Sequence, residues 1–334
     1  MPTQPTSGAL PLGGACLICL VALARPAFPQ AFVPPQGEGN VTTTYQNSLA
    51  RGHLLDSGQR ASGANANDPV RAHTLTAEVE FGLTERVALK LALPFVAARY
   101  GGGAPHVIGV SGGPTTIDDG TYHGGPQDFR FGARMNVASR PLFITPFVEG
   151  VVPSHHYESR GHAVIGLDLR ALIIGTNVAR FVDIIPGTYV HAAVSHAIVQ
   201  KVAGIRPNGS RVDSEVGYFV TPRLALRLLE SFHITHDGIA FQQPGQSREV
   251  SLNHDRLHRY NFLNLGGGFA LAINDSVDVF GAASKMVWGQ NVHPHLGFAV
   301  GMNMHFRTAR GAGGPSPSQA AMPPWPAAQA PATH

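Results

Sequence analysis

The stretch TLTAEVEFGLTERVALKLALPF, residues 74–95, decides the fold. Every odd position from 75 to 83 and from 87 to 95 carries an apolar side chain, whereas the charged residues Glu78, Glu80 and Lys90 stand at even positions. A side-chain period of two gives a β-strand one apolar face and one polar face. The stretch therefore predicts an antiparallel hairpin whose two strands meet in a short turn.

The same alternation continues along the chain and predicts twelve strands in all. Apolar side chains again occupy every second position in 128–137 and in 295–306, for example. Each strand is about as long as one that crosses a membrane, which needs about 9–11 residues. The predicted strands lie near residues 39–50, 72–83, 86–97, 126–138, 142–152, 162–175, 186–199, 210–220, 223–234, 259–272, 276–288 and 295–306.

The connections between these strands differ in length in a regular way. Short connections, at 83–86, 138–141, 220–223 and 273–276, contrast with long ones at 51–71, 98–125, 153–161, 200–209 and 235–258. Short turns at one end, long loops at the other and an even number of strands are typical of an outer-membrane barrel. We therefore expect an all-β protein, a transmembrane antiparallel up-and-down β-barrel of about twelve strands.

Alternation alone also fits a soluble sandwich, whose polar face would point outward. Three features favour the membrane barrel: the length of the strands, an N-terminal segment typical of export, and the end of the last strand. That strand closes on 301–306, where Gly301 is followed after two intervening residues by the apolar Met304, and after one more by the aromatic Phe306.

In a membrane barrel the polar face lines the lumen. The residues predicted to line it are seven acids and seven bases: Glu78, Glu80, Lys90, Asp128, Arg130, Arg134, Glu149, Asp168, Arg170, Arg211, Asp213, Glu215, Arg223 and Arg227. Because the two signs balance, we expect little selectivity by charge.

Both ends of the chain differ from the barrel in composition. Residues 9–24 form an uncharged apolar run that is short for a membrane helix and suits the core of a signal peptide, although the first charged side chain is only Arg25. We predict a signal peptide at 1–31, the barrel at 32–306 and a disordered Ala/Pro-rich tail at 307–334. The tail is either a spacer or a tether to the cell wall or to a partner.

Composition excludes several classes of protein. Only 13% of the 334 residues are charged and the formal net charge is +3, which argues against a disordered acidic chain, a coiled coil or a nucleic-acid-binding protein. The two cysteines, Cys16 and Cys19, lie in the predicted leader. A mature chain without them has no disulfide, no thiolate zinc site and no cysteine nucleophile.

Histidine is unusually frequent, with 17 in the chain. Several stand close together in sequence: His155, His156 and His162; His233 and His236; His254 and His258; and His293 and His295. Imidazoles at such spacings can bind zinc or copper. Polar loop residues and lumen lining explain them as well, so neither a metal site nor a cofactor is predicted.

The enzymatic alternative is a lipid hydrolase. Such an enzyme needs a serine beside a histidine on the lipid-facing wall. The nearest pairs are His156 with Ser159, which lie in a loop, and Ser195 with His196, which point to opposite faces because they are adjacent on a strand. Neither pair suits the chemistry, and the protein is expected not to be an enzyme.

Three segments carry a family resemblance. Residues 82–86 followed by VALKLALPFV, the strand 125–134 and the turn 220–226 resemble the outer-membrane β-barrel family named for the phenol meta-cleavage degradation pathway, whose members are putative transporters. The match covers about residues 40–306. The resemblance implies a barrel in the bacterial outer membrane that passes small hydrophobic or aromatic compounds, and it carries over no catalytic or binding residue.

The function predicted from the sequence is thus a porin-like channel with a narrow or gated lumen. A largely plugged structural barrel stays open as an alternative, and a lipid hydrolase is a weaker one. The expected partners are outer-membrane lipid, the barrel-assembly machinery and a small-molecule solute, with no nucleic acid.

Overall fold

The computed structural model describes residues 31–61, 68–102, 117–240 and 246–308. The predicted signal peptide and tail lie almost wholly outside these residues, so both stay predictions. The strands are β1 Glu38–Arg51, β2 Pro69–Gly82, β3 Val87–Tyr100, β4 His123–Pro126, β5 Asp128–Met135, β6 Phe143–Pro153, β7 Ala171–Phe181, β8 Thr188–Val199, β9 Gly209–Thr221, β10 Leu224–Thr235, β11 Asn261–Asn274, β12 Val277–Gln290 and β13 His295–Arg307. The helices are α1 Arg248–Leu252 and α2 His254–Leu257.

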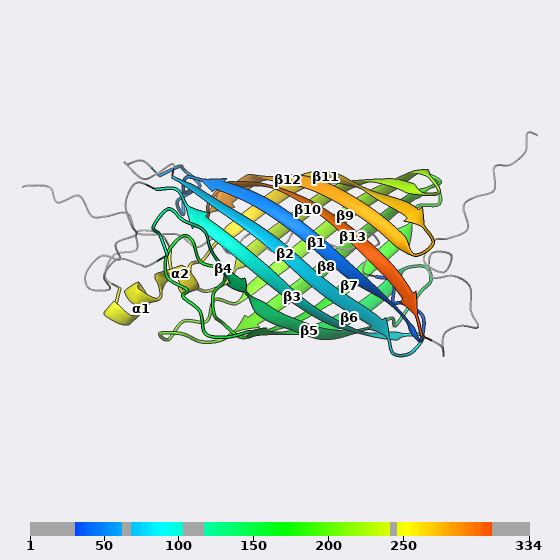
Figure 1. The fold of residues 1–334 in the computed structure, drawn as a ribbon, viewed down its shortest axis with the longest axis horizontal. Coiled ribbons are helices and arrows are strands. Elements are labelled where there is room, and N and C mark those ends of the chain that lie inside the picture. Colours follow the sequence, from blue (N-terminus) through cyan, green and yellow to red (C-terminus); the bar gives the residue numbers. More distant parts are fainter. Residues whose placement is uncertain (1–30, 62–67, 103–116, 241–245, 309–334) are drawn as a thin grey trace, which may run out of the picture.

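The strands form one closed antiparallel barrel (Figure 1). Consecutive strands pair with each other, except for β4 and β5, and the pairing of β1 with β13 closes the ring. Two short strands, β4 and β5, both pair with β3 and share one position in the wall. The wall therefore has twelve strand positions, which confirms the predicted count and fold class.

The break between β4 and β5 has a local cause in β3. Pro94 has no backbone N–H, so it cannot complete the ladder, but its carbonyl accepts a hydrogen bond from the Gln127 N–H at 2.8 Å. Pairing shifts by one residue across this point, from Phe95 opposite Pro126 to Ala92 opposite Arg130. Gln127 thus marks a β-bulge, a common device for bending a strand at a barrel wall.

The barrel wall is apolar on the outside. Leu91 is 53% exposed, whereas its neighbour Ala92 is 3% exposed and faces inward. The same contrast follows the predicted alternation on the other strands, where large apolar side chains such as Phe131, Ile174 and Val216 are exposed. An apolar outer surface on every strand suits a wall surrounded by lipid.

The two ends of the barrel differ. We call the end that carries the connections 52–68, 101–122, 154–170, 200–208, 236–260 and 291–294 the loop end, and the end that carries 83–86, 136–142, 182–187, 222–223 and 275–276 the turn end. The short helices α1 and α2 lie at the loop end (Figure 1). Among the described residues no helix is long and apolar enough to cross a membrane.

One predicted strand is wrong over much of its length. The alternation in 162–175 predicted a wall strand, but β7 begins only at Ala171, and residues 154–170 form a loop. Their backbone amides are bound by side chains from other loops, chiefly Asp118 and Asp255, in place of a neighbouring strand. We call residues 154–170 the plug loop.

Candidate functional site

Six charged side chains from β2, β3, β5 and β6 meet on the inner wall. We call Glu78, Glu80, Lys90, Arg130, Arg134 and Glu149 the charged wall. Lys90 Nζ lies 2.6 Å from Glu149 Oε2 and 3.9 Å from Glu78 Oε2, and Arg130 Nη1 lies 3.9 Å from Glu149 Oε1. Arg134 pairs with Glu80. Strand alternation places these residues together, because each stands at an inward position.

The charged wall is balanced, with three carboxylates and three cations in contact. Such pairs cancel much of each other's field at a distance, and breaking one leaves a charge that is partly shielded from water. The charged wall therefore presents a polar surface of small net charge to a solute in the lumen.

A second group of charges lies on β8, β9 and β10. Arg227 makes two hydrogen bonds to Glu215, which also accepts a hydrogen bond from the Tyr189 hydroxyl. Glu215 and Arg227 line a small cavity of about 40 Å³ together with Asp213. Arg211 binds Asp213 at 2.9 Å.

Sequence reasoning missed Tyr189. A side chain at Gly217, which faces Tyr189 across the strand pair, would overlap the tyrosine ring, since a Cβ there would lie 2.1 Å from ring atom Cζ. The lack of a side chain at Gly217 thus lets the ring lie across the strand and reach Glu215.

A cavity of about 380 Å³ lies between the charged wall and the plug loop. All six charged-wall residues line it, together with Asp128 and Arg211. Val164, Leu167 and Leu169 of the plug loop and Ile173 of β7 supply apolar surface. The volume is near the lower end of the range for ligand pockets, roughly 300–1,000 Å³.

Two buried carboxylates hold the middle of the plug loop. Asp118, from the β3–β4 connection, accepts hydrogen bonds from the backbone N–H groups of His162 and Ala163, both at 2.9 Å, and from His162 Nδ1 at 3.0 Å. Asp255 of α2 accepts one from the Gly161 N–H at 2.8 Å. Carboxylates suit this role because each accepts several hydrogen bonds.

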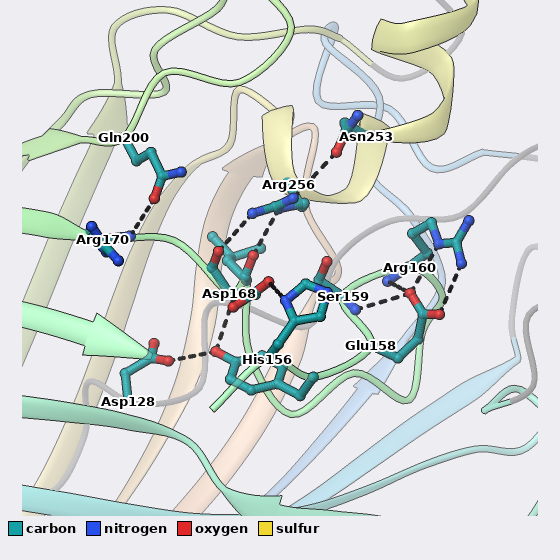
Figure 2. Close-up of polar contacts among 12 residues, drawn as sticks. Asp128, His156, Glu158, Ser159, Arg160, Asp168, Arg170, Gln200, Asn253 and Arg256 are labelled. Carbon is teal, nitrogen blue, oxygen red and sulfur yellow. Dashed lines mark hydrogen bonds and ion pairs between the residues drawn. The ribbon is translucent and has the colours of Figure 1, made fainter. Parts of the chain in front are cut away.

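The end of the plug loop is held around Asp168, whose φ of 53° is uncommon for a residue with a side chain. Arg256 of α2 donates to the carbonyls of Leu167 at 2.9 Å and Asp168 at 2.6 Å. The Tyr157 hydroxyl accepts from the Asp168 N–H at 3.0 Å and donates to Asp128 Oδ1 on the wall at 2.5 Å. Figure 2 shows these contacts joining α2, the plug loop and the wall.

The electrostatic surroundings of Asp118 and Tyr157 favour the protonation states that these hydrogen bonds require. Burial raises the pKa of Asp118, but hydrogen bonds from His162 and Ala163 outweigh it, so the pKa stays below its ordinary value. Burial and the nearby charge of Asp128 raise the pKa of Tyr157 above its ordinary value, which keeps its hydroxyl protonated as a donor. Ala163 and Val164 also pack against a small apolar cluster at the loop end that includes Tyr100.

The start of the described chain contacts the turn end. The carbonyl of Ala31 accepts a hydrogen bond from Thr145 Oγ1 at 2.7 Å, and the carbonyl of Phe32 accepts one from Arg134 at 2.8 Å. The Phe32 ring lies 4.5 Å from that of Phe143, centroid to centroid. Inward side chains thus hold this segment against the turn end of the wall.

Eleven of the fourteen residues predicted to line the lumen lie on strands. Glu78, Glu80, Lys90, Asp128, Arg130, Arg134, Glu149 and Arg211 border the larger cavity, and Asp213, Glu215 and Arg227 border the smaller one. The remaining three are corrections. Asp168 belongs to the plug loop, Arg170 is exposed at its end, and Arg223 is exposed in the β9–β10 turn, because the chain has left the wall at these points.

The serine–histidine pairs considered for a hydrolase separate in space. Ser195 borders the larger cavity, whereas His196 binds Ser210 Oγ at 3.0 Å. His156 pairs with Asp168 at 2.6 Å, and the Ser159 N–H donates to Glu158. Neither candidate pair forms a contact between its own serine and histidine.

Comparison with known proteins identifies the fold of this chain through solved structures and not through sequence. No family model and no curated protein matches the sequence. The crystal structure of the COG4313 outer membrane channel from Pseudomonas putida superposes with a TM-score of 0.65 at 12% identity, over 85% of this chain and 100% of that one. This chain has the fold of a bacterial outer-membrane β-barrel.

Other outer-membrane barrels align less well. The P. putida toluene transporter TodX aligns over 82% of this chain with 10% identity and a TM-score of 0.43, and the NanC porin over 80% with 8% identity and the same score. Scores this low carry no argument about what this barrel transports. The resemblance to the phenol-pathway family stays a prediction, whereas the location in the bacterial outer membrane is confirmed.

Proposed function

We propose that this barrel is an outer-membrane channel that passes small uncharged solutes, aromatic compounds among them, through a lumen gated by the plug loop. The observation that carries the proposal is the cavity of about 380 Å³ between the charged wall and the apolar side of the plug loop. A solute of one or two rings fits this volume, since a cavity of about 150 Å³ already holds benzene.

The balance of the charged wall supports uncharged cargo. A charged solute would have to compete with pairs such as Lys90 with Glu149, which are already in contact. A neutral solute with a polar group could hydrogen-bond to the charged wall and pack against Val164 or Leu169 without breaking a pair. The resemblance to the phenol-pathway family points toward the same class of solute.

In outer-membrane barrels the short turns face the periplasm, so the loop end faces the cell exterior. A solute would therefore meet the plug loop first. The apolar outer face suits contact with outer-membrane lipid, and the last strand, with Phe306 near its end, is the element we expect the barrel-assembly machinery to recognise.

Liposome swelling tests the proposal, with phenol, benzoate and benzylammonium as size-matched neutral, anionic and cationic solutes. We expect phenol to enter fastest. Arg130→Ala should change the ratio of benzoate to benzylammonium, whereas the control Arg223→Ala, which alters an exposed turn, should not. A strong anion preference in the native protein would contradict the proposal.

A largely plugged structural barrel is the second candidate. It is favoured by the contacts at both ends, where Asp118 and Asp255 hold the plug loop and Thr145 holds Ala31. No flux of any of the three solutes would select this alternative.

A further inference from the structure

Three histidines from three separate connections meet at the loop end. His53 follows β1, His162 belongs to the plug loop, and His293 lies between β12 and β13. One ring nitrogen of each lies within 4.8 Å of those of the other two. The ring centroids of His53 and His293 are 4.0 Å apart, and His162 lies 5.9 Å from each.

Two of these rings are oriented by hydrogen-bond acceptors. Nδ1 of His162 donates to Asp118 Oδ2 at 3.0 Å, and Nδ1 of His293 donates to the Gly52 carbonyl at 2.7 Å. Because both acceptors lack a proton, each neutral ring carries its hydrogen on Nδ1 and its lone pair on Nε2. A carboxylate or carbonyl behind the imidazole in this way is the usual support for a metal-binding histidine.

The site is also closely packed and largely shielded from water. His162 and His293 are 4% and 3% exposed, and the Tyr100 ring stacks on His162 at 4.3 Å with an interplanar angle of 13°. His53 is more exposed than the other two and gives access from the loop end. Orientation before binding reduces the conformational entropy that a ligand would otherwise cost.

We propose that His53, His162 and His293 bind one Zn²⁺ ion through their imidazoles. Three neutral nitrogen ligands suit zinc and other borderline metals, whereas Mg²⁺ and Ca²⁺ prefer oxygen. Tetrahedral zinc with bonds of 2.0–2.1 Å places its ligand nitrogens about 3.3 Å apart. Because the ring nitrogens already lie within 4.8 Å of one another, small side-chain rotations bring them to this spacing, and solvent supplies the fourth ligand.

Zinc at this position fastens the plug loop to the wall. His53 follows β1 and His293 precedes β13, which are paired strands, while His162 sits in the middle of the plug loop beside the backbone bound by Asp118. The ion would join the plug loop to that side of the barrel, so bound zinc favours the closed position. The binding itself does not depend on what the barrel transports.

A second cluster, His254, Asp255 and His258, is less suited to a metal. Its only carboxylate already accepts the hydrogen bond from Gly161 that anchors the plug loop. Its histidines stand on the four-residue helix α2 and at its end. This cluster serves as a comparison in the experiment.

The test is zinc binding to the purified full chain in detergent, after chelation of adventitious metal. Isothermal titration with ZnCl₂, with bound metal measured by mass spectrometry, should give one ion per chain. We expect His53→Gln and His293→Gln each to weaken binding at least tenfold. His155→Gln, an exposed histidine of the plug loop, is the matched control and should bind as the native protein does.

A second readout covers variants that fold poorly. Zinc should slow tryptic cleavage after Arg160 and Arg170 in the native chain but not in His53→Gln, whose partly exposed position makes it the variant of the three most compatible with folding. The proposal is overturned if His53→Gln and His293→Gln bind zinc as tightly as the native protein. Loss of binding in His254→Gln alone would assign the ion to the second cluster and also overturn it. Solute flux enters neither readout, so failure here and failure of the channel proposal are distinguishable.

Discussion

The barrel wall and the plug loop are stabilised in different ways. In the wall every strand except the short β4 is hydrogen-bonded to two neighbours, and the apolar face of the wall meets lipid. The plug loop has no such ladder and is held by a few side chains, among them Asp118, Asp255 and Arg256. Stability is therefore distributed over the whole wall, whereas that of the plug loop depends on a few contacts, and we expect loss of these contacts to release the plug loop while the wall stays intact.

The largest effect is expected inside the wall. Arg227→Ala leaves Glu215 buried without its cation, and removing one partner of a buried pair costs about 3–5 kcal/mol. The barrel should lose much of its heat-modifiable folded form on a gel. Arg223→Ala is the matched control because Arg223 is exposed in a turn. Equal stability of the two variants would show that the Glu215 pair does not support the wall.

The lipid face of the wall should be nearly as sensitive. Leu91→Arg places a charge on the outer face at mid-strand, which costs roughly 2–4 kcal/mol at the bilayer midplane. Ala92→Lys, one residue away, points inward beside Glu78 and should be tolerated. Urea titration of the folded fraction in liposomes measures both, and equal losses would contradict the assignment of Leu91 to the outer face and Ala92 to the inner face.

The plug loop should respond without loss of the wall. Asp118→Asn weakens charge-assisted hydrogen bonds worth about 1.5–3 kcal/mol each to His162 and Ala163. Trypsin should then cleave after Arg160 faster, while the heat-modifiable band stays unchanged. The control is Asp119→Asn, since Asp119 is an exposed neighbour that contacts Thr121 and His123. A fall in the folded fraction with Asp118→Asn would mean that wall and plug loop are stabilised together.

The smallest effect concerns pH. Because the pKa of Tyr157 is raised in the closed plug loop, the closed position is fully favoured below the ordinary tyrosine pKa of about 10 and is weakened as pH rises above it. Cleavage after Arg160 should accelerate above about pH 10. Tyr157→Phe, which lacks the hydroxyl bound to Asp128, should be cleaved somewhat faster at neutral pH and lose this acceleration. An alkaline acceleration unchanged in Tyr157→Phe would assign it to another group.

The difference between wall and plug loop also explains what the sequence could reveal. Eleven of the twelve predicted strand ranges agree with the structure to within three residues at either end, because a period of two is a local signal. The range 162–175 failed because Ala163, Ile165, Leu167 and Leu169 continue the alternation of β7 into the loop. The groups that bind this loop, Asp118 and Asp255, are distant in sequence.

For the candidate site, too, the sequence could reveal what depends on local alternation and could not reveal contacts between distant segments. The charged wall could be predicted, since each of its residues stands at an inward strand position. Arg170 and Arg223 could not be placed correctly, because alternation does not show where the chain leaves the wall. The grouping of His53 with His162 and His293 has no local signal either, since more than a hundred residues separate each from the next in sequence.

Single-channel conductance in a planar bilayer tests most directly the claim that the plug loop closes the lumen. The native chain would be compared with Asp118→Asn combined with Arg256→Ala, and with the control Asp119→Asn. We predict low conductance for the native protein and the control, and open events several-fold larger or more frequent for the double variant. Equal conductance of the folded double variant and the native protein would contradict the account.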